Sequence, residues 1–190
     1  KKVYEANITV FDALKKSDYD PKGEFCLERY VSAHAIMISF EGIPALYFNS
    51  IFGTANDEAK FIITGNNRDV NRYKWNLKNI TNKLKNNKTK QNIFYKNITY
   101  LLNIRRKQKA FHPNASRLNL NFGTKIYGFK RISIDKKQTI LCITNLSSKI
   151  QRVQLNKAYH SWNNLIGSKI EIKNKLLILK PFETIWLSNR

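Results

Sequence analysis

The side chains that could carry out acid–base chemistry in this sequence are few and scattered. Asp57 and Glu58 stand together in a polar stretch, and Asp69 directly follows a basic residue. Glu24 and Glu28 fall at the start of a predicted helix, where acidic side chains complement the helix dipole. General acid–base work needs two such groups held within reach of one substrate. We therefore expect these carboxylates to be surface charges and predict no catalytic pair.

The histidines and cysteines also form no catalytic or metal-binding pattern. His34 falls on the apolar face of a predicted helix, and His112 precedes Pro113, which favours an extended backbone. Cys26 and Cys142 lie far apart, each within an apolar pattern, and neither has a partner at metal-ligand spacing. We interpret the two histidines as structural and the two cysteines as reduced core residues. No metal site is predicted.

The polar stretch over residues 49–72 is the best candidate for a functional loop. It follows the short apolar run Gly42–Phe48, which predicts a buried parallel strand near 43–48. Two polar segments follow that run, Asn49–Asp57 and Thr64–Arg72. Loops of this length in compact domains are usually functional or disordered. The elements that must hold this loop are the strand before it and the helices on either side.

The motifs in this region occur in an order that resembles one known family. Ser39-Phe40-Glu41 ends a helical pattern, Gly-Ile-Pro-Ala-Leu-Tyr-Phe follows at 42–48, and then come Ser-Ile-Phe-Gly-x-x-Asn-Asp at 50–57 and Arg-Asp-Val-Asn-Arg at 68–72. Together they resemble the eighth strand and following loop of the sucrose phosphorylase branch of the alpha-amylase superfamily, glycoside hydrolase family 13. Segments 3–14 and 108–114 extend the resemblance loosely over nearly the whole chain. It implies that the chain is the C-terminal part of such an enzyme.

The resemblance implies a substrate-holding role for this chain. Retaining enzymes need a carboxylate nucleophile and an acid roughly 5 Å apart; in the family these come from the fourth and fifth barrel strands, which this sequence does not contain. Arg72 matches the arginine of the family's Asp-x-Asn-Arg motif, which hydrogen-bonds hydroxyls of the glucosyl unit. A guanidinium suits that task because its fork of donors is fixed. Asn71 and Asn49 are the further substrate-binding candidates, and Arg68 is a weaker one.

By resemblance, the intact enzyme would transfer a glucosyl group from a sucrose-type donor to inorganic phosphate through a covalent intermediate. The donor would be sucrose, sucrose 6-phosphate, glucosylglycerate or glucosylglycerol, and no metal or organic cofactor is required. Asn49 and the pair Thr54-Ala55 depart from residues common in relatives, so the acceptor preference stays open. Without the missing N-terminal barrel portion and its carboxylates, the chain alone is expected to be inactive.

The apolar pattern changes period along the chain and so predicts two regions. Apolar residues recur at helical spacing through 24–40 and again through 91–106, the latter being the final helix outside a barrel. From about residue 118 the period is two, which predicts short antiparallel strands. These are Lys125–Ile132, Thr139–Asn145, Ile150–Leu155, Lys169–Lys173, Lys175–Leu179 and Phe182–Leu187. We therefore expect residues 1–110 to close a (β/α)8 barrel and residues 111–190 to form an antiparallel β-sandwich domain.

The charge balance supports a rival hypothesis. The formal net charge is +21, which is typical of nucleic-acid-binding proteins. However, the lysines are scattered among asparagines, as in segment 82–90, and a bias toward these two residues explains the charge equally well. A basic nucleic-acid- or carbohydrate-binding module without catalysis is the alternative, and the product of a split or decayed gene is a third reading. Only nonspecific attraction to polyanions is expected in any case.

The sequence contains no membrane or secretory signal. No apolar run reaches the roughly 18 to 20 residues of a membrane span, and no signal peptide opens the chain. A cytoplasmic protein is the expectation.

Overall fold

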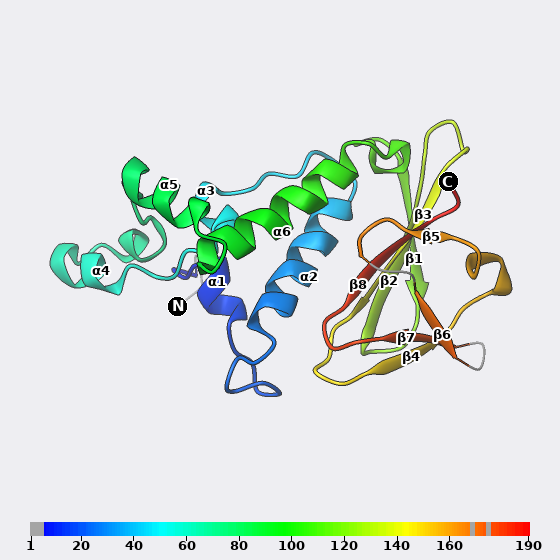
Figure 1. Ribbon diagram of the computed structural model, residues 1–190, viewed down its shortest axis with the longest axis horizontal. Coiled ribbons are helices and arrows are strands. Elements are labelled where there is room, and N and C mark those ends of the chain that lie inside the picture. The colour runs from blue at the N-terminus through cyan, green and yellow to red at the C-terminus, as the bar shows by residue number, and fades with distance from the viewer. Residues whose placement is uncertain (1–5, 168–169, 174–175) are drawn as a thin grey trace, which may run out of the picture. The chain divides into compact units, whose positions relative to one another are not determined.

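The computed structural model describes residues 6–167, 170–173 and 176–190 (Figure 1). The chain divides into two compact units that alternate along the sequence. The first unit contains the residues up to Tyr30 and Ala45–Ile98, and the second contains Val31–Pro44 and Thr99–Arg190. Two helices, α2 (Cys26–Ser39) and α6 (Lys90–Arg105), each begin in the first unit and end in the second.

The first unit is helical. Between the ends of α2 and α6 that it contains, its elements are α1 (Val10–Leu14), α3 (Phe48–Ile51), α4 (Glu58–Thr64), the 3-10 helix η1 (Asn67–Asn71) and α5 (Leu77–Lys85). Local side chains determine where these short helices begin. Thr9, Asp57, Asn66 and Asn76 each accept a backbone N–H of the first turn of the helix that follows. Such N-caps satisfy donors that have no partner within the helix.

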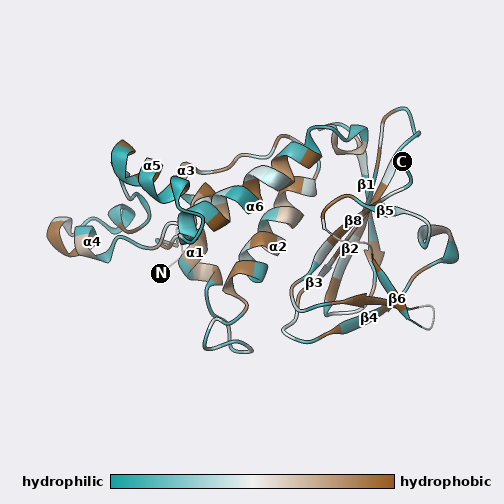
Figure 2. Cartoon of the chain, viewed as in Figure 1, coloured by the Kyte–Doolittle hydropathy of each residue, from teal (hydrophilic) through white to brown (hydrophobic). Residues whose placement is uncertain are grey.

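An aromatic cluster forms the core of the first unit. The rings of Phe11, Tyr30 and Phe94 meet pairwise, with centroids 4.7 to 6.3 Å apart. The hydroxyl of Tyr30 donates to the carbonyl oxygen of Ser50, which joins this cluster to α3. Helix α5 contributes little to the core. It is largely hydrophilic in Figure 2, and Ile80 is its buried residue.

The expected strand near 43–48 does not form. Residues 43–47 have no regular secondary structure, Phe48 begins α3, and Ile43 is 84% exposed. A strand requires neighbours that pair with its backbone N–H and C=O groups. Among the described residues no strand pairs with this segment, because every ladder of the two sheets lies after residue 115. The apolar run therefore lies extended and largely uncovered.

The expected helices agree closely with the structure. The pattern over 24–40 corresponds to α2, which begins at Cys26, and the pattern over 91–106 corresponds to α6, which begins at Lys90. Cys26 and Cys142 are free thiols, and only Cys142 lies in the core. His34 is buried, as expected for a packing residue.

The second unit contains two antiparallel sheets, which confirms the expected β-sandwich. The larger sheet has the order β1 (Ser116–Asn121), β2 (Ile126–Ile132), β3 (Thr139–Asn145), β8 (Thr184–Ser188) and β5 (Asn163–Asn164). The smaller sheet has the order β4 (Gln151–Gln154), β7 (Leu176–Leu179) and β6 (Glu171–Lys173). Strands β1 and β5 were not expected from the sequence. Lys169 and Lys175, where two expected strands begin, and the start of segment 3–14 lie outside the described residues.

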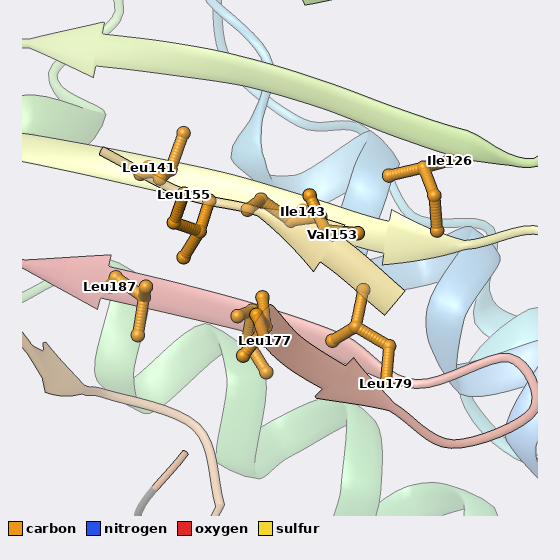
Figure 3. Packing of buried hydrophobic residues seen from close by; sticks show 9 residues of the cluster. Ile126, Leu141, Ile143, Val153, Leu155, Leu177, Leu179 and Leu187 are labelled. Atoms are coloured by element: carbon orange, nitrogen blue, oxygen red, sulfur yellow. The ribbon is translucent and has the colours of Figure 1, made fainter. Parts of the chain in front are cut away.

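The core of the second unit lies between these sheets. Figure 3 shows side chains of β3 and β8 pointing toward those of β4 and β7. The buried cluster consists of Ile126, Leu141, Ile143, Val153, Leu155, Leu177, Leu179, Ile185 and Leu187. Because side chains alternate across a strand, Trp186 points to the opposite face of its sheet and meets the ring of Phe111 at 4.8 Å.

The end of α2 is joined to the larger sheet within the second unit. The buried guanidinium of Arg131 on β2 donates to the carbonyl oxygens of Ser39, His112 and Ala115. Arg105 at the end of α6 donates to the carbonyl oxygens of Ile38 and Gly42. Both arginines thus satisfy carbonyl groups that a helix end and the following turn leave without partners.

Candidate functional site

The three candidate residues lie in the first unit, close to one small cavity. Asn49 on α3 and Asn71 at the end of η1 line the same cavity of about 140 Å³. Its other lining residues are Ile8, Thr9, Val10, Tyr47, Ser50 and Thr54. Arg72 directly follows Asn71 but does not line the cavity, and its side chain is exposed.

Asn49 connects the beginning of the polar stretch to its end. The side chain is 3% exposed, and its Nδ2 donates to the carbonyl oxygen of Tyr73 at 2.9 Å. The same nitrogen lies 3.3 Å from the hydroxyl oxygen of Tyr47. Its Oδ1 is buried and has no hydrogen-bond partner within the described part of the chain. Asn49 is therefore a fixed group, and only half of its polar capacity is used.

The polar stretch is folded locally, which the sequence analysis did not predict. The backbone N–H of Asp57 donates to the carbonyl oxygen of Val70 at 2.7 Å, which brings the segment after α3 against η1. The ammonium group of Lys60 on α4 lies 2.9 Å from the carboxylate of Asp69 on η1. Helix α4 and η1 therefore form a compact pair in place of a long irregular loop.

Thr54 and Trp75 form a second connection, which sequence reasoning missed. The indole Nε1 of Trp75 donates to Oγ1 of Thr54 at 3.0 Å. The ring of Trp75 packs edge-on against Tyr73 at 4.8 Å and lies 6.4 Å from Phe52. No local pattern indicates this pair, because its members are 21 positions apart.

The side chain of Arg72 is exposed next to Asn71, which lines the cavity. Among the described residues, its guanidinium has no hydrogen-bond or ion-pair partner. Asp69 lies three positions earlier, and its pKa is lowered chiefly by hydrogen bonds from Lys60 and Thr64, with a contribution from the charge of Arg72. Asp69 is therefore an ionised, engaged carboxylate and an unsuitable proton donor at neutral pH.

The other side chains near the cavity also serve structure. Asp12 accepts from the backbone N–H of Asn56 at 2.5 Å, and Asn56 in turn accepts from the backbone N–H of Thr9 at 2.8 Å. Within the described part of the chain, no three His, Cys, Asp or Glu residues gather in a way that could hold a metal ion. The described residues that line the cavity include amides and hydroxyls but no carboxylate.

Two solved structures that share this fold are a trehalulose synthase and a trehalose-6-phosphate hydrolase. Trehalulose synthase from Pseudomonas mesoacidophila matches 85% of this chain and 38% of its own, with a TM-score of 0.60 and 13% identity. Trehalose-6-phosphate hydrolase from Bacillus licheniformis matches 90% of this chain and 40% of its own, with a TM-score of 0.63 and 14% identity. At such identities the likeness concerns the fold alone. The fold is that of the barrel enzymes of glycoside hydrolase family 13.

Comparison with curated sequences gives a narrower group of relatives than the fold does. Glucosylglycerate phosphorylase of Escherichia coli is 32% identical over 187 residues, which are 97% of this chain and 32% of the relative. A second glucosylglycerate phosphorylase, from Allomeiothermus silvanus, is 28% identical over the same share of this chain. Sucrose phosphorylase of Agrobacterium vitis is 35% identical over 71 residues, which are 37% of this chain and 13% of the relative. No protein-family model matches the sequence. Glucosylglycerate and sucrose phosphorylases are therefore homologues of this chain, which confirms the resemblance to the sucrose phosphorylase branch of family 13.

The chain spans about a third of the length of the curated relatives that it matches. Within the described residues, every helix is too short or too polar to cross a membrane.

Proposed function

We propose that this chain is the C-terminal part of a glucosyl phosphorylase. In this proposal residues 1–110 close the catalytic barrel, and residues 111–190 form its C-terminal β domain. The 32% identity to the E. coli phosphorylase over 97% of this chain carries the proposal. In the complete barrel, residues 43–48 would pair with neighbouring strands, and the exposed side chains of Ile43, Tyr47 and Phe48 would be covered.

The proposed donor is glucosylglycerate, the substrate named for two of the relatives with the highest coverage. A carboxylate outside this chain attacks the anomeric carbon and forms a glucosyl–enzyme ester, while a second carboxylic acid protonates the departing glycerate oxygen. Inorganic phosphate then displaces the carboxylate. The products are glycerate and glucose 1-phosphate with retained configuration.

Three residues of this chain would hold the glucosyl unit. The exposed guanidinium of Arg72 can donate two parallel hydrogen bonds to neighbouring hydroxyls, Asn71 offers an amide group, and Asn49 offers its Oδ1 as an acceptor. Holding the sugar in one orientation contributes to the rate because the reacting atoms then meet at the right angle and distance. The chain alone lacks the reacting carboxylates and should be inactive.

A chimera tests this proposal. The matching third of the E. coli relative is replaced by this chain, and glucose 1-phosphate release from glucosylglycerate and phosphate is measured, with sucrose as the comparison donor. Activity in the chimera, none in the isolated chain, and a preference for glucosylglycerate are expected. Phosphorolysis by the isolated 190-residue chain would refute its predicted inactivity, and a folded but inactive chimera would count against the phosphorylase role.

The net charge of +21 supports one other candidate, a basic nucleic-acid- or carbohydrate-binding module without catalysis. Filter binding at about 0.15 M salt with specific and scrambled oligonucleotides separates the two functions, because nonspecific charge attraction falls steeply with salt. Sequence-dependent retention would favour the binding module, and equal, salt-sensitive retention of both oligonucleotides would count against specific nucleic-acid recognition.

A further inference from the structure

We propose that Asn49 and Thr54 are positioning residues that hold the backbone around Arg72 in its working conformation before substrate binds. This inference rests on the proposed role of Arg72 in holding the glucosyl unit. It assigns to Thr54 an indirect task, and to Asn49 the same task in addition to its proposed contact with the sugar; both act through the segment that follows η1.

We call each of the two hydrogen bonds that hold this segment a clamp. The first clamp holds the peptide group that follows Arg72. Tyr73 directly follows Arg72, and its carbonyl oxygen accepts from Nδ2 of Asn49 at 2.9 Å. Asn49 is itself held, because its backbone carbonyl oxygen accepts from the N–H groups of Phe52 and Thr54 at 3.3 and 3.1 Å. A buried side chain on a short closed turn therefore fixes the chain on the C-terminal side of Arg72.

The second clamp lies two residues further on. Oγ1 of Thr54 accepts from the indole N–H of Trp75 at 3.0 Å, and Thr54 is 5% exposed. The backbone that presents Thr54 is constrained by Gly53, whose φ of +58° and close approach to the ring of Phe94 admit no side chain. Thr54 therefore presents its hydroxyl oxygen to Trp75 from a constrained backbone.

The N-terminal side of Arg72 is held as well. Val70 accepts from the backbone N–H of Asp57 at 2.7 Å, and Asp69 pairs with Lys60 at 2.9 Å. Arg72 therefore lies between two fixed stretches of backbone, while its own guanidinium has no partner among the described residues. A rigid backbone that carries available donors loses less conformational entropy when a ligand binds.

An asparagine at position 49 does not maximise the stability of the folded chain. Its buried Oδ1 has no partner among the described residues, and an unsatisfied buried acceptor is costly. An apolar side chain of similar size would avoid that cost but would release the carbonyl group of Tyr73. The amide is explained by the need to hold this one peptide group.

Limited trypsin digestion of the full chain tests the clamps, because trypsin cuts between Arg72 and Tyr73 only when the local backbone opens. Asn49→Asp preserves size and replaces the donor with a carboxylate. Thr54→Val preserves shape and removes the acceptor, whereas Thr54→Ser retains it. Cleavage after the exposed Arg152 on β4 is the internal control.

We expect Asn49→Asp and Thr54→Val to accelerate cleavage after Arg72 by about tenfold, the effect of losing one hydrogen bond, with no change after Arg152. Thr54→Ser should cleave at the wild-type rate. An NMR spectrum should also show a shift of the Trp75 indole N–H signal in Thr54→Val alone, with Trp75→Phe providing the assignment. Unchanged cleavage after Arg72, or equal acceleration at both sites, would overturn the positioning role.

The same variants in the chimera connect the clamps to the reaction. For Thr54→Val we expect kcat to fall about tenfold with little change in KM, because Arg72, Asn71 and Asn49 remain and only their placement loosens. Asn49→Asp also alters a proposed binding group, so KM should rise in that variant as well. Wild-type kcat in a variant with accelerated cleavage would overturn the positioning role. An inactive parent chimera would instead overturn the proposed function, while the digestion result would still decide whether the clamps exist.

Discussion

The guanidinium of Arg131 donates to the carbonyl oxygen of Ser39 at 2.7 Å, and the two residues are 92 positions apart in the sequence. Ser39 is the last residue of α2, so the bond places a buried cation at the C-terminal end of a helix, where the helix dipole favours positive charge. This contact fixes where the helix ends on the larger sheet of the second unit.

Replacing Arg131 by methionine should strongly destabilise the second unit. The substitution retains the length of the side chain but leaves the carbonyl oxygens of Ser39, His112 and Ala115 without their donor. We expect a loss of about 3 kcal/mol in the free energy of unfolding, measured by urea denaturation. Arg152→Met on the exposed face of β4 is the matched control, and an equal effect in both variants would contradict the role assigned to Arg131.

Substitutions at two glycines of the first unit distinguish the cost of backbone strain from the cost of a steric clash. Gly53 and Gly65 have similar φ angles, +58° and +64°, but a Cβ on Gly53 would lie 2.4 Å from the ring of Phe94, whereas a Cβ on Gly65 would meet nothing within 4 Å. We expect Gly65→Ala to cost roughly 1 kcal/mol from strain and Gly53→Ala roughly 3 kcal/mol. Thermal unfolding of both variants checks this order, which equal losses would disprove.

Asp135 provides a titration test. Its pKa is lowered from 3.8 to about 2, chiefly by the hydrogen bond from Ser133 and the backbone N–H of Lys137. Because the folded pKa lies below the unfolded one, the stabilisation is fully present above about pH 4 and is lost as the pH falls toward 2. Ser133→Ala should raise the pKa of Asp135 toward its ordinary value in an NMR titration of the carboxyl carbon. An unchanged titration curve would exclude Ser133 as the main cause.

Arg72→Lys tests the proposed sugar contact in the chimera. Lysine preserves the charge but lacks the planar fork of donors, so it cannot hold two hydroxyls at once. We expect kcat/KM to fall about a hundredfold, with unchanged thermal stability because Arg72 is exposed. Arg68→Lys, four positions earlier in the same segment, should have a smaller effect. Comparable losses in both variants would contradict a specific contact between Arg72 and the sugar.

Much of the fold can be predicted from local pattern. The helical spacing over 24–40 and 91–106 located α2 and α6 because each helix buries one face, and period-two segments located strands such as β2, β3 and β8. The edge strand β1 was missed because it is largely polar and exposed, and two-residue β5 is too short to show a period. The segment 43–48 has the composition of a buried strand, but a strand forms only where neighbouring strands pair with its backbone N–H and C=O groups.

The candidate site likewise has features that the sequence predicts and features that only the tertiary structure shows. The order of residue types alone revealed the resemblance to the sucrose phosphorylases and the motif around Arg72, and it showed no convincing carboxylate pair. Only the tertiary structure showed that Asn49 holds Tyr73 and that Thr54 holds Trp75, because hydrogen bonds across 24 and 21 positions leave no periodic trace in a sequence. Side-chain identity is local information, whereas the placement of one buried donor against a distant carbonyl depends on how the whole unit packs.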